Sequence, residues 1–165
     1  MRDNKQNLIL KLCARLGILL RQRNTKMATA ESCTGGMLAS FIIQNAGASA
    51  YFDSGFITYS NQAKQNLLNV DKKIIDKYGA VSFECVEQML KGLLKKTKAD
   101  YGVAISGVAG PKGGTKINPI GSVWIGVANN KKQQIKKYLF TGDRYEIQTK
   151  STTRAIKDLI KILEL

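Results

Sequence analysis

A short apolar run, Met27 to Thr29, leads into the sequence Ala-Glu-Ser-Cys-Thr-Gly-Gly at residues 30–36, in a chain that contains no histidine. A Ser-His-Asp or Cys-His site is therefore excluded. If Ser32 is a nucleophile, its proton must pass to a carboxylate or to a lysine whose pKa is lowered. Cys33 is a rival nucleophile, although a lone buried cysteine is more often inert packing. The chemistry of this segment depends on the base beside it.

Backbone amides give the same segment a second chemical role. The first N–H groups of a helix lack intrahelical partners and lie at the positive end of its dipole, so they stabilise an anion or a developing oxyanion. Here these would be the amides of Thr34, Gly35 and Gly36. Alternatively, Ser32 or Thr34 merely caps the helix and the glycines allow close packing. The sequence leaves both interpretations open.

A candidate base follows the next expected strand. That strand ends at Tyr59, and Lys64 falls in the first turn of the following helix. A lysine near a helix N-terminus experiences a positive field, and if it is also desolvated it is a neutral base near pH 7. Tyr59 would hydrogen-bond a substrate or pass a proton. The alternatives are a surface lysine and a tyrosine that only packs.

Two further features favour an anionic ligand. Six of the 15 glycines lie between Gly107 and Gly126, and the loop from Ser106 to Thr115 would form a concave anion nest, although a plain turn before a hairpin explains the same pattern. Arg144 is the only arginine between positions 23 and 154 in a chain that otherwise uses lysine. Its planar guanidinium suits a phosphate group.

The periodicity of apolar residues predicts the elements that position these residues. We expect helices over 7–23, 37–44, 61–68, 81–96 and 143–163, and strands over 26–30, 52–59, 101–106, 120–128 and 133–140. The last two strands are expected to form a hairpin that turns at 129–132. Helices alternating with strands predict a three-layer α/β/α sandwich with a mixed sheet.

Composition restricts the class of protein. A chain of 165 residues with 44% hydrophobic content predicts one domain over 1–165. The sequence has no run of eighteen apolar residues and no signal peptide at its start, which predicts a cytoplasmic protein without a membrane partner. Three cysteines without Cys-x-x-Cys spacing, and no histidine, predict neither a disulfide framework nor a metal site.

The net charge of +14 has two explanations. Lysine and arginine neutralise phosphates in nucleic-acid interfaces. However, 20 of the 26 basic residues are lysines spread along the chain, and no aromatic-rich basic stripe accompanies them. A solvated lysine-rich surface is therefore the favoured interpretation, and its positive field would attract an anionic metabolite.

Four segments in order resemble the CinA C-terminal domain family. They are residues 30–36, residues 58–64, residues 106–111 with Gly113-Gly114-Thr115, and Gly142-Asp143-Arg144. Their order and spacing are similar to those of the standalone nicotinamide-nucleotide amidases of that family. The resemblance covers residues 7–163.

This resemblance implies hydrolysis of the carboxamide of nicotinamide mononucleotide (NMN), which gives nicotinic acid mononucleotide and ammonia in pyridine-nucleotide recycling. The implied mechanism uses a Ser/Lys pair without metal or cofactor. Ser32 would attack the amide carbon, Lys64 would accept its proton and later protonate the departing ammonia, and Tyr59 would help orient these groups.

The remaining implied roles concern binding. The amides of Thr34, Gly35 and Gly36 would form the oxyanion hole. Ribose and phosphate would be held by Arg144 and by the loop residues Ser106, Gly107, Ala109 and Gly110. The resemblance also implies a homo-oligomer, a dimer or a higher assembly.

Two other classes of function stay open. A catalytically silent nucleotide-binding or regulatory module would keep the glycine loops and Arg144 yet show no turnover. A nucleic-acid accessory protein would bind with a steep salt dependence and would not need Ser32. The scattered lysines make a nucleic-acid partner the least favoured of these.

Overall fold

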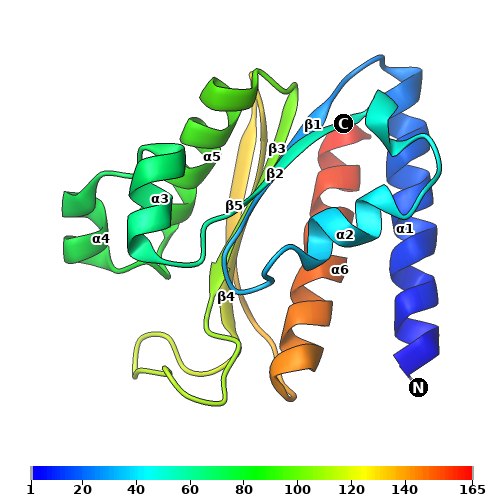
Figure 1. The fold of residues 1–165 in the computed structure, drawn as a ribbon. Helices are drawn as coiled ribbons and strands as arrows, with labels where there is room; N and C mark the ends of the chain where they lie inside the picture. The colour runs from blue at the N-terminus through cyan, green and yellow to red at the C-terminus, as the bar shows by residue number, and fades with distance from the viewer. Residues whose placement is uncertain (1, 165) are drawn as a thin grey trace.

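In the computed structural model, which describes residues 2–164 and their side chains from residue 6, five strands form one mixed sheet with helices on both faces (Figure 1). The elements in chain order are α1 (Arg2–Gln22), β1 (Met27–Glu31), α2 (Met37–Ile43), η1 (Ala48–Ala50), β2 (Phe52–Ile57), α3 (Asn61–Leu68), α4 (Lys72–Tyr78), α5 (Phe83–Thr97), β3 (Tyr101–Gly107), β4 (Ser122–Asn129), β5 (Gln133–Leu139) and α6 (Arg144–Leu163). The predicted α/β fold with a mixed sheet is confirmed.

The strand order is β2-β1-β3-β4-β5. Strands β2, β1 and β3 are parallel, whereas β4 and β5 are antiparallel to their neighbours. The carboxyl ends of the three parallel strands, at Glu31, Ile57 and Gly107, therefore meet at one edge of the sheet. In open α/β sheets, ligands bind outside such an edge.

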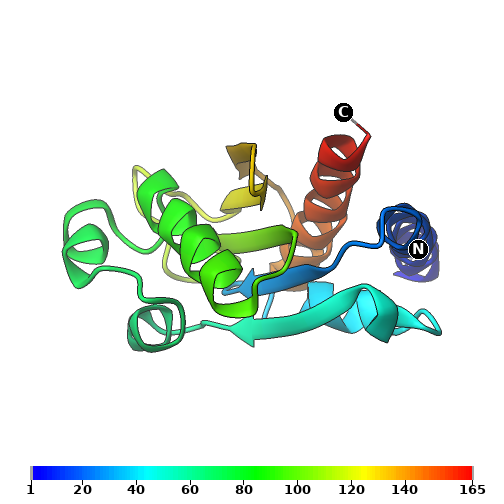
Figure 2. The same cartoon turned by 90° about the horizontal axis from the view of Figure 1, so that it is seen from above.

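Helices leave this edge on opposite faces. Helix α2 connects β1 to β2 on the face that also carries α1 and α6, whereas α3, α4 and α5 connect β2 to β3 on the other face (Figures 1 and 2). The connection that follows β1 and the connection that follows β2 therefore run over opposite faces of the sheet. A crevice forms where successive connections cross to opposite sides of a sheet.

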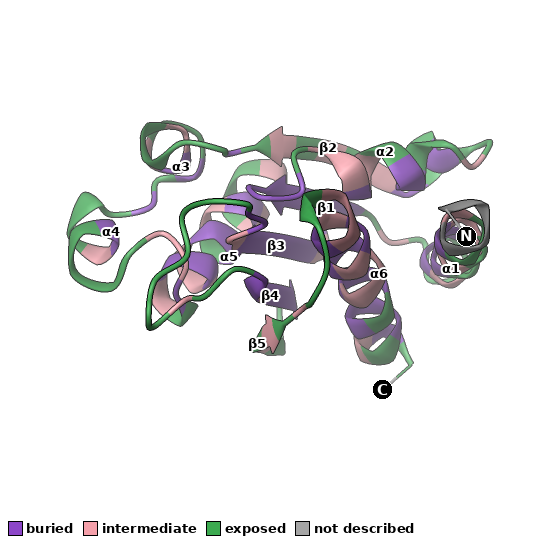
Figure 3. Ribbon diagram, turned by 90° about the horizontal axis from the view of Figure 1, so that it is seen from below, coloured by how far each residue is buried: buried purple, intermediate pink, exposed green. Residues whose placement is uncertain are grey.

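Successive side chains along a strand point to opposite faces of the sheet, so the core consists of two clusters, one on each face. Met27 of β1 contributes to the cluster under α1, α2 and α6, whereas Ala28 and Ala30 contribute to the cluster under α5. The central strands β1, β3 and β4 are mostly buried, whereas the edge strands are more exposed (Figure 3). Within the described residues, no helix combines the length and the apolar character that a membrane-spanning segment requires.

Side-chain caps fix the starts of the helices near this edge. Ser60 Oγ accepts a hydrogen bond from the Ala63 amide at 3.0 Å, so α3 begins where the sequence predicts. Ser82 caps α5 in the same way. Asp143 and Glu146 form a reciprocal capping box at the start of α6.

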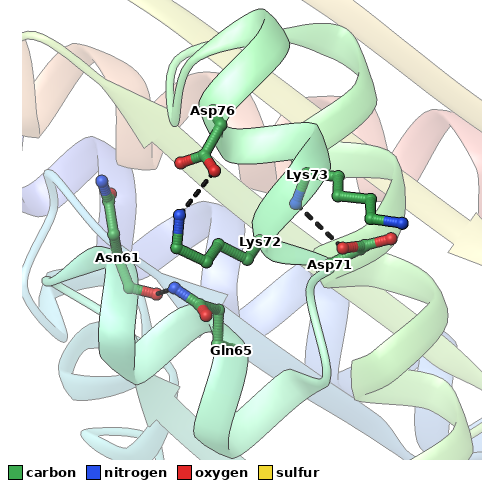
Figure 4. A network of polar contacts seen from close by, with 6 residues as sticks. All are labelled: Asn61, Gln65, Asp71, Lys72, Lys73 and Asp76. Carbon is green, nitrogen blue, oxygen red and sulfur yellow. Dashed lines mark hydrogen bonds and ion pairs between the residues drawn. The ribbon is translucent and has the colours of Figure 1, made fainter.

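Helix α4 was not among the predicted elements. It has seven residues, too few for apolar periodicity to reveal. Ile75 anchors it in the core cluster under α5, and polar contacts lie at its start and on its exposed face (Figure 4). Asp71 Oδ1 accepts a hydrogen bond from the Lys73 amide at 2.9 Å, and Lys72 pairs with Asp76 at 2.6 Å. The short helix η1 was likewise not predicted.

Close packing of α3 on α5 depends on Gly92. A Cβ atom at this position would lie 1.9 Å from the Leu68 carbonyl oxygen at the end of α3. We expect Gly92→Ala to lower the free energy of unfolding by about 2 kcal/mol, because α3 must move, even though alanine favours helix formation. Urea unfolding measures the change. Lys95→Ala on the exposed face of α5 is the control, and equal stability of the two variants would contradict the prediction.

Candidate active site

Ser32 and Lys64 meet at the carboxyl edge of the sheet. Ser32 follows β1 directly, and Lys64 lies in the first turn of α3, as predicted. Lys64 Nζ lies 3.0 Å from Ser32 Oγ and donates to the Thr58 carbonyl oxygen at 2.7 Å. Both side chains are buried, with Lys64 only 1% exposed. The structure therefore brings together the predicted nucleophile and the predicted base.

The environment of Lys64 favours its neutral form. Burial lowers the pKa of Lys64, because the ammonium loses its hydration, and the neighbouring thiols of Cys85 and Cys33 oppose this shift only in part. In the described part of the chain, no carboxylate forms an ion pair with it. A neutral amine has a lone pair that accepts a proton from a hydroxyl. Lys64 is thus equipped to act as a base toward Ser32.

The carboxylate next to the nucleophile has a different role. Glu31 is buried, and its Oε2 accepts hydrogen bonds from the amides of Gly36 and Leu38 at 3.1 Å each, while Oε1 accepts from the Ala39 amide at 2.9 Å. A carboxylate is stabilised at the positive end of a helix dipole. Of the two candidate bases, the carboxylate holds α2 in place and the lysine contacts Ser32.

Two of the three predicted oxyanion donors are already hydrogen-bonded. The Gly35 amide donates to the Ser32 carbonyl oxygen at 3.1 Å, and the Gly36 amide donates to Glu31. Both amides therefore have hydrogen-bond partners within the protein, which leaves Thr34 as the expected donor without such a partner among the described residues. Residues 33–36 form a turn before α2, so the amides there close the turn instead of facing a ligand. Thr34 does not line the cavity described below.

A cavity of about 300 Å³ opens beside Ser32 and Lys64, within the range of small-molecule sites. It draws on the ends of all three parallel strands and on the start of α6. Of the residues proposed from the sequence, it is lined by Ser32, Tyr59, Lys64, Ser106, Gly107, Ala109, Gly110 and Arg144. It is also lined by Cys33, Asn61, Ala80, Val81, Val108, Lys112 and Gly113.

Ser106 has a structural contact within this lining. It is 1% exposed, and its Oγ donates to the Ala80 carbonyl oxygen at 2.7 Å. The hydroxyl thus ties the end of β3 to the segment before α5. In the same loop, the amides of Ala109 and Gly110 make no hydrogen bond within residues 2–164, and Gly110 has a φ of 82°. These two amides of cavity-lining residues are therefore not occupied by a backbone acceptor in the described chain.

Arg144 joins two walls of the cavity. Its Nη1 donates to the Gly110 carbonyl oxygen, and its Nη2 donates to the Tyr59 hydroxyl at 3.0 Å. The Tyr59 hydroxyl therefore contacts Arg144, whereas its carbonyl oxygen is the part nearer to Lys64, 3.5 Å from Nζ. Neither acceptor is a carboxylate, so these two contacts do not pair the guanidinium with an acid.

The lining carries positive charge without a compensating acid. Lys112 and Arg144 line the cavity together with Lys64, and no aspartate or glutamate among the side chains that the structure describes does so. Lys112 was not predicted, because one lysine among 20 in the sequence carries no distinguishing signal. Among the described residues, no group of three histidine, cysteine, aspartate or glutamate side chains is arranged to hold a metal ion. The cavity suits an organic anion.

Comparison with known proteins identifies related chains. Residues 10–163 match the family model described as CinA C-terminal domain. A protein of Escherichia coli K12 named nicotinamide-nucleotide amidohydrolase PncC is 41% identical over 152 residues, with 92% of each chain covered. A CinA-like protein of Thermotoga neapolitana is 45% identical over 146 residues, which cover 88% of this chain. This chain spans only 36% of that longer relative.

Solved structures of CinA-type proteins superpose on nearly the whole chain. A competence/damage-inducible protein from Agrobacterium tumefaciens superposes with a TM-score of 0.93 at 33% identity, covering 96% of each chain. A CinA superfamily protein from Klebsiella pneumoniae superposes with a TM-score of 0.91 at 35% identity, covering 94% of this chain and 98% of that one.

Burial of Lys64 makes stability depend on pH with a definite sign. Between its lowered pKa and the ordinary value for lysine, the unfolded chain binds a proton that the folded chain does not, so stability rises with pH. Below the lowered pKa, wild type carries the full cost of burying the ammonium. We expect the free energy of unfolding of wild type, relative to Lys64→Met, to increase with pH across this window.

Urea unfolding of both proteins from about pH 6 to about pH 10 measures this difference. Lys73→Met removes an exposed lysine and is the control, which should show a difference from wild type that does not change with pH. A wild-type advantage over Lys64→Met that falls as pH rises would contradict the prediction.

Proposed function

This chain belongs to the CinA C-terminal domain family, and we propose that it is a nicotinamide-nucleotide amidohydrolase that converts NMN and water into nicotinic acid mononucleotide and ammonia. The observation that carries the proposal is the 3.0 Å contact between Lys64 Nζ and Ser32 Oγ inside a positively charged cavity. A buried lysine with a lowered pKa beside a serine is an arrangement suited to nucleophilic catalysis.

In the first half of the proposed reaction, Ser32 Oγ forms a bond to the carboxamide carbon while its proton moves to Lys64 Nζ. The carbonyl oxygen becomes an oxyanion. When the oxyanion collapses, the C–N bond breaks and Lys64 gives its proton to the departing nitrogen. Ammonia leaves, and the nicotinoyl group remains as an ester on Ser32.

In the second half, water attacks the ester carbon and Lys64 accepts a proton from it. The bond to Ser32 Oγ then breaks, and Lys64 returns the proton to that oxygen. The free acid ionises after release, and the enzyme regains its starting state. Lys64 thus acts in turn as base and acid, and this requires an amine whose pKa lies well below that of a solvated lysine.

The charge of the cavity supports a nucleotide as substrate. Arg144 lies at the start of α6 and uses one N–H on each terminal nitrogen for Gly110 and Tyr59, which leaves further N–H groups for a phosphate. Lys112 adds a second cation to the same lining. We therefore assign the phosphate to the side of the cavity near Arg144 and the carboxamide to the side near Ser32.

Substitution of the Ser/Lys pair tests the reaction. We expect Ser32→Ala and Lys64→Met each to lower the rate of ammonia release from NMN by at least about 10³-fold, because the two residues act as a unit. Ser54→Ala and Lys73→Met are matched controls at residues that do not line the cavity, and they should retain wild-type rates. Undiminished turnover in Ser32→Ala would contradict the mechanism.

The same assay separates the alternative of a catalytically silent binding module. Such a module would bind NMN in calorimetry, and all variants as well as wild type would release no ammonia. The burial that lowers the pKa of Lys64 favours the enzyme over the binding module, because binding alone requires no base beside Ser32.

Substitution of Arg144 tests the assigned orientation of the nucleotide. We expect Arg144→Gln to raise KM for NMN by about 10- to 100-fold, since a charge-assisted contact with phosphate is lost. Hydrolysis of nicotinamide riboside, which lacks the phosphate, should change much less. Arg15→Gln replaces an exposed arginine of α1 and is the control. Equal losses with both substrates would show that Arg144 does not recognise the phosphate.

A further inference from the structure

Gln148 of α6 reaches the turn that follows the nucleophile. Its side chain is half-buried, and Nε2 donates to the Cys33 carbonyl oxygen at 2.8 Å. The two residues are 115 positions apart in sequence, and α6 contacts α2 on the same face of the sheet (Figure 3). Gln148 does not line the cavity. It therefore acts on the turn and does not contact a ligand there.

Three carbonyl groups in this turn are held by hydrogen bonds. The Ser32 carbonyl oxygen accepts from the Gly35 amide at 3.1 Å, the Cys33 carbonyl oxygen from Gln148, and the Thr34 carbonyl oxygen from the Met37 amide at 3.1 Å. The peptide groups on both sides of Cys33 are thus fixed. Within the described chain, the Gln148 bond is the one hydrogen bond that the Cys33 carbonyl accepts.

Fixed carbonyls also fix the amides. In a trans peptide the N–H group points opposite to the C=O group. The Cys33 amide therefore points away from Gly35, and no backbone carbonyl within residues 2–164 accepts a hydrogen bond from it; its own side-chain sulfur is the protein atom that interacts with it. By contrast, the Ser32 amide donates to the Ile105 carbonyl oxygen at 2.9 Å and is unavailable.

Cys33 lines the cavity and directly follows the nucleophile. In the nucleophile elbow of α/β hydrolases, the amide in this position is one of the donors that stabilise the oxyanion. Resting on the proposed function as a Ser/Lys amidase, we propose that the Cys33 amide is an oxyanion donor and that Gln148 is a positioning residue. Gln148 anchors the peptide that follows Cys33, while the Gly35 amide anchors the preceding peptide, which carries the Cys33 amide.

Three substitutions of Gln148 separate donation from packing. Gln148→Met keeps the approximate shape without a donor, Gln148→Glu places an acceptor against the Cys33 carbonyl, and Gln148→Arg keeps a donor. We expect Gln148→Met and Gln148→Glu to lower kcat for NMN by about 10- to 100-fold with little change in KM, because a misplaced oxyanion donor weakens only transition-state binding. Gln148→Arg should recover most of the loss.

Gln6→Met is the matched control. Gln6 Nε2 donates to the Tyr145 hydroxyl at 3.0 Å, so this variant also removes a glutamine contact with α6, but away from the cavity. It should leave kcat unchanged. Thermal unfolding of every variant is measured in parallel. If Gln148→Met is unfolded, the isosteric Gln148→Glu provides the decisive comparison.

Labelling by an alkyl fluorophosphonate gives a second readout that does not require NMN. Ser32 Oγ attacks phosphorus, its proton passes to Lys64, fluoride leaves, and the phosphoryl oxygen occupies the oxyanion position. The labelling rate should fall in Gln148→Met and Gln148→Glu and recover in Gln148→Arg. Ser32→Ala is the unlabelled reference.

The outcomes distinguish the inference from the proposed function. If wild type releases no ammonia but is labelled at a rate that depends on Gln148, the substrate assignment fails and the positioning role stands. If folded Gln148→Met or Gln148→Glu retains the wild-type kcat and labelling rate, or if Gln6→Met loses as much, the positioning role is overturned. A wild type with neither turnover nor labelling overturns both.

Discussion

The candidate site depends on one constraint: the amine of Lys64 is buried beside Ser32, and none of the carboxylates that the structure describes is paired with it. A buried ammonium is costly, whereas a buried neutral amine that is hydrogen-bonded costs much less. The fold holds the amine there by seating α3 against α5, where Gly92 leaves room for the Leu68 carbonyl. The capping of α3 by Ser60 fixes the start of the same helix.

Glu31 shows how the fold keeps the two charges apart. An acid beside Lys64 would stabilise the ammonium and raise its pKa, which would remove the base. The one carboxylate adjacent to the nucleophile is instead occupied by three amides of the α2 segment. The start of α2 therefore holds this carboxylate by three hydrogen bonds, and Lys64 forms no ion pair with it.

The fold and the Ser/Lys pair were predicted from local patterns in the sequence, namely the spacing of apolar residues and the short motifs that follow the expected strands. Each strand that ends at the site is followed at once by its functional segment, so the strand ends place Ser32, Lys64 and the Gly107 loop together once the parallel order is known. The hydrogen bonds of the Gly35 and Gly36 amides were not predictable, because the first depends on the conformation of the turn and the second on where the Glu31 side chain lies. Gln148 gave no signal either, since its partner lies 115 residues away.

Helix α6 connects the two ends of the site. Arg144 and Gln148 are four residues apart and therefore lie on the same face of the helix. Arg144 reaches the Gly110 loop and Tyr59, whereas Gln148 reaches the carbonyl of Cys33. A rigid helix fixes the distance between these two contacts. In the proposed enzyme, the same element that binds the phosphate would also hold the nucleophile turn, so that a bound nucleotide and a correctly placed oxyanion donor would depend on one position of α6.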